Sequence, residues 1–170
     1  MIGRWLFRWR GVIGFGAYCV VFGLGRPDVR SCLVGLPLVV MGLGLRFWAM
    51  GYLGQAVRAR ELVTEGLVQD GPYRWLSHPL YTGNFLLVLG MVITLRPDWL
   101  VAIAVLAGFL VEYGLIAAAE RSWLAAQRLP VVPRRFSGKR ARAEWPTWVV
   151  TGVAYGLGWV KAVWLGRLAR

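Results

Sequence analysis

The sequence predicts an all-α integral membrane protein, a polytopic helical bundle of about five transmembrane helices. Two observations lead to this prediction. Of the 170 residues, 58% are hydrophobic and only 16% are charged, whereas soluble globular domains carry about 25% charged residues. The apolar residues also gather in long runs, which lie at 12–25, 32–53, 80–95, 99–119 and 148–166.

The runs differ in how well they match the roughly 20 residues that a membrane-spanning helix needs. Runs 32–53 and 99–119 are long enough as they stand. The first run reaches this length only if its helix starts near Trp5, so that nearby arginines extend toward the lipid headgroups. Run 80–95 is short, and we expect it to be packed and tilted. Run 148–166 either spans the membrane or lies in its interface, and we favour a span. Glycines within the runs are expected to let helices approach closely, at Gly42, Gly44, Gly156 and Gly158.

The remaining composition argues against other classes of protein. The net charge of +12 comes from 20 basic and 8 acidic residues. In so apolar a chain we interpret this excess as contact with anionic lipid, and we expect no nucleic-acid partner. Cys19 and Cys32 lie at or within apolar runs, and their spacing fits neither a disulfide framework nor a metal site.

The distribution of the basic residues predicts the orientation of the bundle. If the first four runs span, the N-terminus, the loop 54–79 and the segment after 119 share one side of the membrane. That side holds most of the arginines, and positive residues favour the cytoplasmic side. We therefore expect the His78 loop and the basic segment 120–147 to be cytoplasmic, in a bacterial inner membrane. The basic residues of that segment are Arg121, Arg128, Arg134, Arg135, Lys139, Arg140 and Arg142.

A short link predicts a helical hairpin formed by residues 80–119. Only residues 96–98 separate the third run from the fourth, and so short a connection joins antiparallel helices. His78 precedes the first of these helices and Glu120 follows the second. We therefore expect His78 and Glu120 at the same membrane depth.

The segment 71–83, with the sequence GPYRWLSHPLYTG, contains the only histidine of the chain. Pro79 disfavours helical geometry at His78 and suits the first position of a helix. Free N–H groups at such a helix start favour anionic or electron-rich ligands. In the alternative interpretation, Ser77 caps the helix and His78 rests at the lipid interface. The flanking Gly-Pro-Tyr-Arg and Tyr-x-Gly favour a functional site.

The order Gly-Pro-Tyr-Arg-x-x-x-His-Pro-x-Tyr-x-Gly resembles the signature of the isoprenylcysteine carboxyl methyltransferase family. These are membrane-embedded methyltransferases that use S-adenosylmethionine, and phospholipid methyltransferases are looser relatives. The sequence LRFWA at 45–49 is similar to a stretch of the bacterial members. The resemblance covers about residues 40–136. We therefore expect residues 1–170 to form a single membrane-embedded domain, of which 137–170 is divergent.

The resemblance implies S-adenosyl-L-methionine as the cofactor, bound from the cytoplasm. Carried over position by position, the binding residues are Tyr73, Arg74, His78, Pro79, Tyr81, Gly83 and Glu120. Arg134 and Arg135 are further candidates, because a guanidinium can grip the cofactor's carboxylate. The chain departs from the family pattern at Ser77, where an arginine is usual, and at Arg121, where a second glutamate is usual. The segment after Leu124 is also shorter than in the family.

The chemistry of methyl transfer agrees with these residue types. Aromatic faces can hold a sulfonium, and the candidates are Tyr73, Trp75 and Tyr81. A carboxylate acceptor is already ionised at neutral pH, so we assign no residue as a general base. Arg74 and Glu112 are candidates for positioning the acceptor. Glu112 could instead form a structural ion pair with Arg46 inside the bundle.

We therefore interpret the chain as a membrane methyltransferase that acts on a lipophilic acceptor. The acceptor itself stays open: a prenylated cysteine carboxylate, a phospholipid amine, a small thiol and a quinone-like lipid all fit. One alternative is an NADPH-dependent reductase of the related sterol-reductase type, with the arginine cluster at 134–142 on the 2′-phosphate. Another is a non-catalytic, degenerate relative that acts as a membrane partner.

Overall fold

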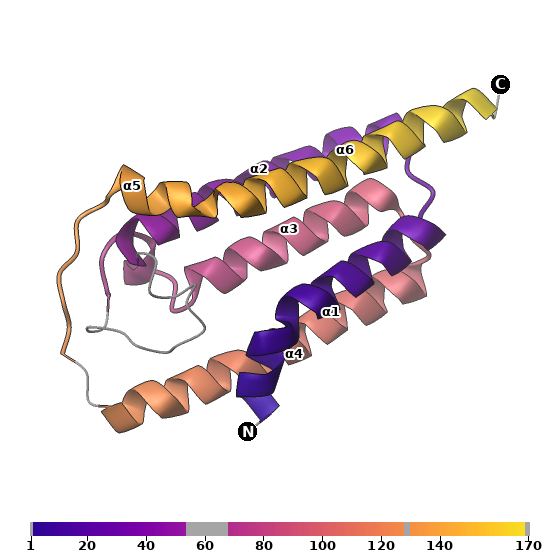
Figure 1. Ribbon diagram of the computed structural model, residues 1–170. Coiled ribbons are helices and arrows are strands. Elements are labelled where there is room, and N and C mark those ends of the chain that lie inside the picture. Colours follow the sequence, from indigo (N-terminus) through magenta and orange to yellow (C-terminus); the bar gives the residue numbers. More distant parts are fainter. Residues whose placement is uncertain (1, 54–67, 128–129, 169–170) are drawn as a thin grey trace.

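The computed structural model describes residues 2–53, 68–127 and 130–168, and this part of the chain is almost entirely helical (Figure 1). The predicted all-α class is confirmed. Residues 54–67 of the predicted loop, and Arg128 of the basic segment, lie outside the described residues. In chain order the elements are α1 (Ile2–Leu24), α2 (Val29–Leu53), η2 (Gly71–Arg74), α3 (Pro79–Leu95), α4 (Trp99–Gln127), α5 (Gly138–Ala141), η3 (Arg142–Glu144) and α6 (Trp145–Leu168).

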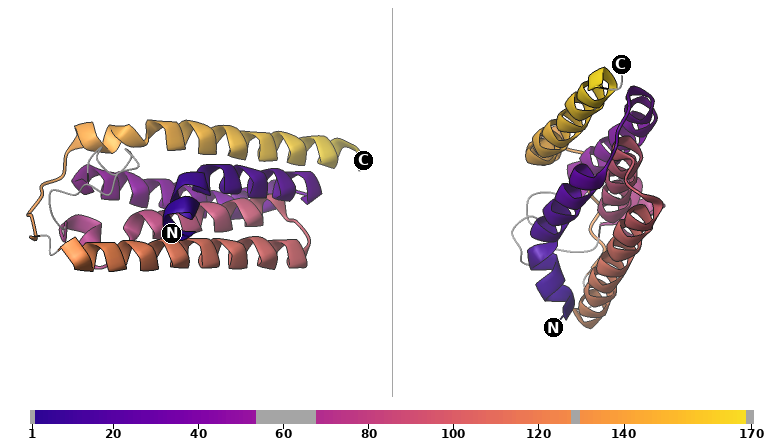
Figure 2. Two further views of the ribbon diagram at one scale, coloured as in Figure 1. Left: turned by 60° about the horizontal axis from the view of Figure 1, so that its bottom comes forward. Right: turned by 90° about the vertical axis from the view of Figure 1, so that its right-hand side faces the viewer.

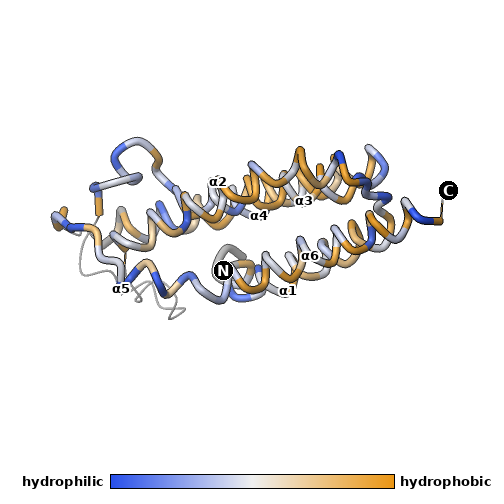
Figure 3. The backbone as a smooth tube through the Cα atoms, turned by 90° about the horizontal axis from the view of Figure 1, so that it is seen from above, coloured by the Kyte–Doolittle hydropathy of each residue, from blue (hydrophilic) through white to orange (hydrophobic). Residues whose placement is uncertain are grey.

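The long helices run side by side along one axis, so the bundle has two ends (Figures 1 and 2). We call the end that carries η2, the start of α3 and the last turns of α4 the His78 end. The other end carries the connections 25–28 and 96–98, and we call it the Asp28 end. Hydrophobic residues follow the middle of the helices, and hydrophilic residues gather toward the two ends (Figure 3).

Among the described residues, three helices are long and apolar enough to cross a membrane: α2, α4 over Trp99–Leu124, and the continuous stretch Gly138–Leu168 that includes α6. The chain is therefore an integral membrane protein. The third run of the sequence forms α3, which is apolar but shorter, as expected. Helix α1 is not among these three helices, and its first half carries arginines at 4, 8 and 10. The last run lies along the bundle beside α2, which agrees with the favoured span (Figure 1).

Glycines let α2 and α3 pack closely together. A Cβ atom at Gly42 would lie 2.8 Å from the carbonyl oxygen of Gly83, and one at Gly90 would lie 3.0 Å from that of Gly35. The glycines on each helix are seven residues apart and so face the same neighbour. The prediction for Gly42 is thus confirmed, and a Cβ atom at Gly158 would lie 3.1 Å from the side chain of Leu95. The predictions for Gly44 and Gly156 are wrong, because nothing lies within 4 Å of a Cβ atom there.

Large aromatic side chains lie between α3 and α4. Phe85 packs against Phe109 with ring centroids 5.8 Å apart, and Tyr81 against Tyr113 at 5.1 Å. Although a short link joins the two helices, the closest packing of α3 is against α2, and α4 packs mainly on α1. The predicted hairpin is confirmed, but rings rather than backbones meet across it.

Polar side chains attach α6 to the bundle. The hydroxyl of Tyr18 in α1 donates to the carbonyl of Ala154 at 2.8 Å, and that of Tyr155 donates to the carbonyl of Cys32. The ammonium of Lys161 donates to the carbonyl of Phe22 and lies 4.8 Å from the centroid of that ring. The final carbonyls of a helix have no partner within the helix and carry negative partial charge. The carbonyls at the end of α1 therefore stabilise the lysine, which lies among apolar residues of α6.

Asp28 organises the other end of the bundle. Its carboxylate accepts the N–H of Ser31 at 2.7 Å, and the Ser31 hydroxyl accepts the N–H of Asp28 at 3.0 Å. This reciprocal pair caps the start of α2. The guanidinium of Arg96 pairs with the same carboxylate, and the Ser31 hydroxyl donates to the carbonyl of Thr94 at 2.8 Å. One acidic side chain thereby joins the start of α2 to the end of α3.

The glycine contacts predict different outcomes for two glycines of the same helix. Gly35→Ala should lower the free energy of unfolding by about 1–3 kcal/mol, because its Cβ atom would lie 2.6 Å from the carbonyl oxygen of Gly90. Gly44→Ala, the matched control, has open space at that position and should be neutral or slightly stabilising. Thermal unfolding of the detergent-solubilised variants measures both. Equal stability of the two variants would contradict the close packing of α2 on α3.

The cap at Asp28 predicts an acid-sensitive contribution to stability. The Ser31 N–H, and then the Arg96 guanidinium, hold the pKa of Asp28 below its ordinary value. The carboxylate's contribution is therefore complete above the unfolded pKa of about 3.9 and is lost as the pH falls through the lower folded value. Asp28→Ala should cost about 1 kcal/mol near neutral pH.

The melting temperature of the wild type should approach that of Asp28→Ala as the pH is lowered below about 4. Asp28→Asn keeps an oxygen for the cap but has no charge to lose, so its own melting curve serves as the control. The idea fails if the gap between wild type and Asp28→Ala is the same at about pH 6 and about pH 3.

Candidate functional site

His78 immediately precedes the first turn of α3. Pro79 takes the first helical position, and the N–H groups of Tyr81 and Thr82 donate to the carbonyl of His78, each at 3.0 Å. The predicted helix start is confirmed. The capping position is His78 itself and not Ser77, and its side chain makes no capping hydrogen bond. The imidazole is thus left for other contacts.

The hairpin brings Glu120 of α4 to His78 and Tyr81. The Tyr81 hydroxyl donates to Oε2 of Glu120 at 2.8 Å, and Nδ1 of His78 lies 3.6 Å from the same oxygen. The His78 and Tyr81 rings stack with centroids 5.1 Å apart and planes 16° apart. The side chains of His78 and Glu120 are 23% and 29% exposed, so both are partly accessible from outside the bundle. We call these three residues the His78 cluster. The predicted proximity of His78 and Glu120 is confirmed.

Tyr73 adds a buried hydroxyl next to this cluster. It comes from η2, whose first residue, Gly71, has a φ of 62°, in the left-handed region that glycine tolerates. The Tyr73 hydroxyl is buried and has no hydrogen-bond partner among the described residues. Burial raises the pKa of Tyr73, and the charge of nearby Glu120 raises it further. The group is therefore a neutral phenol, and a bound ligand could supply its missing partner.

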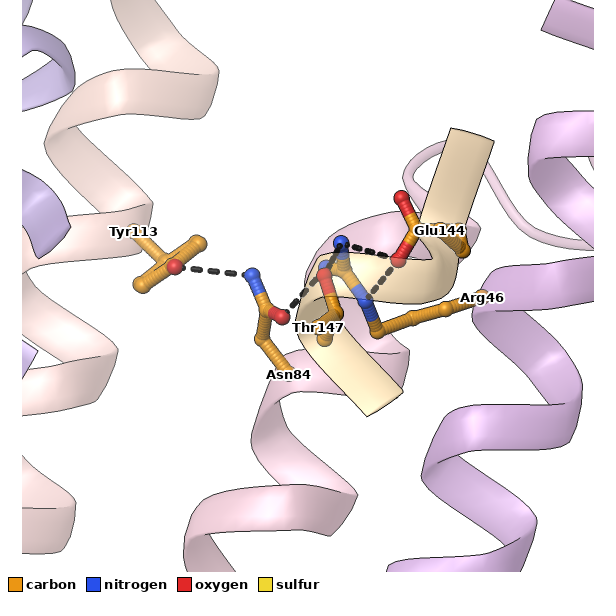
Figure 4. A network of polar contacts seen from close by, with 5 residues as sticks. All are labelled: Arg46, Asn84, Tyr113, Glu144 and Thr147. Carbon is orange, nitrogen blue, oxygen red and sulfur yellow. Dashed lines mark hydrogen bonds and ion pairs between the residues drawn. The ribbon is translucent and has the colours of Figure 1, made fainter. Parts of the chain in front are cut away.

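Arg46 of α2 lies at the centre of a polar network near the His78 end of the bundle (Figure 4). Its Nε and Nη2 donate to Oε2 of Glu144 at 3.0 and 2.7 Å. Its Nη1 donates to Oδ1 of Asn84, and Nδ2 of Asn84 donates to the Tyr113 hydroxyl at 2.8 Å. The alternative Arg46–Glu112 ion pair is therefore wrong, because the carboxylate partner of Arg46 comes from η3.

Glu112 of α4 is not part of the network around Arg46. Its Oε1 is buried and has no hydrogen-bond partner among the described residues. Arg10 of α1 is close enough to interact electrostatically with Glu112, Tyr81 and Tyr113. Glu112 therefore sits beside the aromatic residues between α3 and α4, on the side covered by α1.

The other predicted residues occupy varied positions. Pro79 and Gly83 are buried; Gly83 packs on α2, where a Cβ atom would lie 2.6 Å from Cγ of Arg46. Arg74 is exposed on η2. Trp75 is 76% exposed, and its ring packs against Trp48 rather than on the His78 cluster.

The segment 130–137 crosses the His78 end and returns the chain to α2 (Figure 1). The N–H of Arg134 donates to the Asp70 carboxylate at 2.6 Å, so this residue adjoins the start of η2. Arg135 is exposed, and its carbonyl accepts a hydrogen bond from Arg140. Nε of Arg140 also donates to the carbonyl of Gly51, at 3.0 Å.

Asn84, Tyr113 and Glu144 are three site residues that sequence reasoning missed. Each had a signal: Asn84 directly follows the motif glycine inside an apolar helix, and a polar side chain there needs a partner. Tyr113 is next to Glu112, which the sequence already indicated as a candidate for positioning the acceptor. Glu144 is an acidic residue within a strongly basic segment.

The described part of the chain offers no cluster of metal ligands, and it has a concavity at the Asp28 end. No group of three or more His, Cys, Asp or Glu residues in it could hold a metal ion. A concavity lined by Arg26, Asp28, Arg30 and Leu165, among others, lies at the Asp28 end, far from the His78 cluster.

Comparisons with known proteins place the chain among relatives. The "Cobalt-zinc-cadmium resistance protein CzcN" of Cupriavidus metallidurans is 30% identical over 147 residues, which cover 81% of this chain and 67% of that protein. The "Uncharacterized protein YpbQ" of Bacillus subtilis is 33% identical over 69 residues, or 39% of this chain and 41% of that protein. No solved structure gives a significant match to the chain.

A family profile described as "Phospholipid methyltransferase" matches residues 31–127. The match begins before the expected core of 40–136 and ends before the segment that carries Arg134 and Glu144. It includes the LRFWA stretch, the whole of segment 71–83 and Glu120. Because the match covers more than half of the chain, this protein belongs to the phospholipid methyltransferase family, within the group related to isoprenylcysteine carboxyl methyltransferase.

Proposed function

We propose that this chain transfers a methyl group from S-adenosyl-L-methionine to a lipophilic acceptor at the His78 end of the bundle. The family is one of membrane methyltransferases. The observation that carries the proposal is the His78 cluster, in which Tyr81 donates to Glu120 at 2.8 Å and His78 stacks on Tyr81. These residues come from the family motif and from the far end of the hairpin, and they meet where a ligand can enter.

The residues around the cluster fit the proposed cofactor. The Glu120 carboxylate can accept hydrogen bonds from hydroxyl or amino groups. The Tyr73 hydroxyl, which has no partner among the described residues, can donate one. The faces of Tyr81 and Tyr113 can stabilise a sulfonium, each by about 0.5–2 kcal/mol. When bound, S-adenosylmethionine would supply an electrophilic methyl group. Arg74, Arg134 and Arg135 are the proposed partners for its carboxylate, with Pro79 and Gly83 shaping the helix start.

A row of rings supports a lipophilic acceptor. It runs from His78 through Tyr81 and Tyr113 to Phe109 and Phe85, with neighbouring centroids 4.2–5.8 Å apart. The row leaves the polar end and enters the apolar part of the bundle between α3 and α4. An alkyl or prenyl chain could follow it and place its reactive head near the His78 cluster. Glu112 and Arg74 are the proposed groups for positioning that head, and no residue is assigned as a base.

The proposal includes an orientation of the protein in the membrane. The His78 end would face the cytoplasm of a bacterium, since the basic segment 120–147 lies there. Residues 1–170 would form one membrane-embedded domain. The bilayer would then supply the acceptor laterally, and the cytoplasm would supply the cofactor.

The first test is binding of S-adenosylhomocysteine to the purified, detergent-solubilised protein by isothermal titration calorimetry. The wild type should bind. Glu120→Gln should weaken binding about tenfold or more, because a neutral amide replaces a charged hydrogen-bond acceptor of nearly the same shape. Ser122→Ala is the matched control: this exposed hydroxyl donates to the carbonyl of Ala118 on the same helix and has no other partner among the described residues. It should leave the affinity unchanged.

NADPH, the cofactor of the alternative reductase, is titrated in a parallel experiment and should not bind. Two results would count against the proposal. One is the absence of S-adenosylhomocysteine binding at millimolar ligand. The other is equal affinity of the Glu120→Gln and Ser122→Ala variants.

A further inference from the structure

The polar network around Arg46 begins in a part of the chain that lies outside the family match. Glu144 belongs to η3, just before α6, and the match ends at residue 127. The Glu144 side chain is 2% exposed and that of Arg46 is 13% exposed. Well-packed apolar residues would serve stability as well as such a buried pair does, so the pair by itself is weak evidence for a stabilising role. Such a pair can also orient the groups that it contacts.

The hydrogen bonds of this network can run in only one direction. A guanidinium donates and cannot accept, so Asn84 must turn its oxygen toward Arg46. The amide nitrogen of Asn84 therefore faces Tyr113 and donates to the tyrosine oxygen at 2.8 Å. That oxygen then accepts, and its own proton is free to be donated elsewhere. No residue in the described part of the chain accepts a hydrogen bond from the Tyr113 hydroxyl.

The Tyr113 ring lies in the middle of the row of rings, between Tyr81 of the His78 cluster and Phe109. It packs edge-on against Tyr81 at 5.1 Å and stacks on Phe109 at 4.2 Å. A reactive head placed there would meet the Tyr113 hydroxyl. A hydroxyl oriented to donate favours an oxygen atom with a lone pair, such as that of a carboxylate or a phosphate, and gives nothing to an ammonium group.

We propose that Glu144, Arg46 and Asn84 are positioning residues, which hold the Tyr113 hydroxyl as a hydrogen-bond donor to an oxygen atom of the lipophilic acceptor. This inference rests on the proposed function and adds the C-terminal segment to the site. It also explains Gly83, because the stem of Arg46 passes against this residue to reach Asn84, where a Cβ atom would lie 2.6 Å from Cγ.

Asn84→Asp separates a positioning role from a structural one. The introduced carboxylate has the same shape and can still pair with Arg46, so the fold should be kept. It has no N–H, however, so the Tyr113 hydroxyl must donate to it and is no longer available to the acceptor. Tyr113→Phe removes the same donor directly. Thr147→Val is the control. The contact between the Thr147 hydroxyl and Arg46 is long, at 3.5 Å, and it lies outside the path of hydrogen bonds from Arg46 through Asn84 to Tyr113.

The assay follows transfer of a labelled methyl group from S-adenosylmethionine in vesicles of phosphatidylethanolamine and phosphatidylglycerol, with and without N-acetyl-S-farnesylcysteine. The two arms distinguish a phosphate from a carboxylate as the oxygen that is bound. With the acceptor that the wild type methylates, Asn84→Asp and Tyr113→Phe should each lower kcat by about tenfold to a hundredfold. The double variant should be no worse than Tyr113→Phe alone, because both changes remove one donor.

Readouts other than turnover keep the inference separate from a loss of fold. The affinity for S-adenosylhomocysteine, the KM for S-adenosylmethionine and the melting temperature should stay near wild-type values in both variants. Full kcat in Asn84→Asp, or losses that add in the double variant, would overturn the inference and leave the proposed function standing. If the wild type binds no S-adenosylhomocysteine and methylates neither acceptor, the proposed function fails and this inference fails with it.

Discussion

The close approach of α2 and α3 is the constraint on which the rest of the structure depends. Gly35 and Gly42 on one helix face Gly90 and Gly83 on the other, so the two backbones meet with little between them. Dispersion contacts, rather than the hydrophobic effect, hold helices together in a membrane, and they need this proximity. The same seam brings α3 close enough for Arg46 to reach past Gly83 to Asn84. A wider spacing would separate the guanidinium of Arg46 from Asn84, its partner on α3.

The opposite face of α3 is built on the contrary principle. Toward α4 it carries Tyr81 and Phe85, which meet Tyr113 and Phe109 through their rings. Small residues on one side and large aromatic residues on the other therefore place α3 against α2 and hold α4 away. The polar ends of the two hairpin helices still meet, through Tyr81 and Glu120. The proposed acceptor path lies between these two helices for that reason.

The segment after the family match is part of the bundle rather than an appendage. Ser137 and Arg140 donate to the carbonyl of Gly51, which is near the end of α2, and Phe136 packs on Tyr52 with centroids 5.9 Å apart. These contacts fix η3 so that Glu144 meets Arg46. This C-terminal segment therefore brings a carboxylate of its own, that of Glu144, to the His78 end of the bundle.

Local pattern determined the helical membrane class, the hairpin and the meeting of His78 with Glu120. Run length, a short link and a proline after histidine are properties of neighbouring residues, so they can be read without knowing the path of the chain. The partner of Arg46 could not be read in this way: Glu112 was the nearer candidate within the apolar runs, whereas the structure uses Glu144, 98 residues away. That choice depends on how the segment 130–144 returns across the His78 end. An ion pair between distant segments is selected by the packing of the whole bundle, and only the tertiary structure decides it.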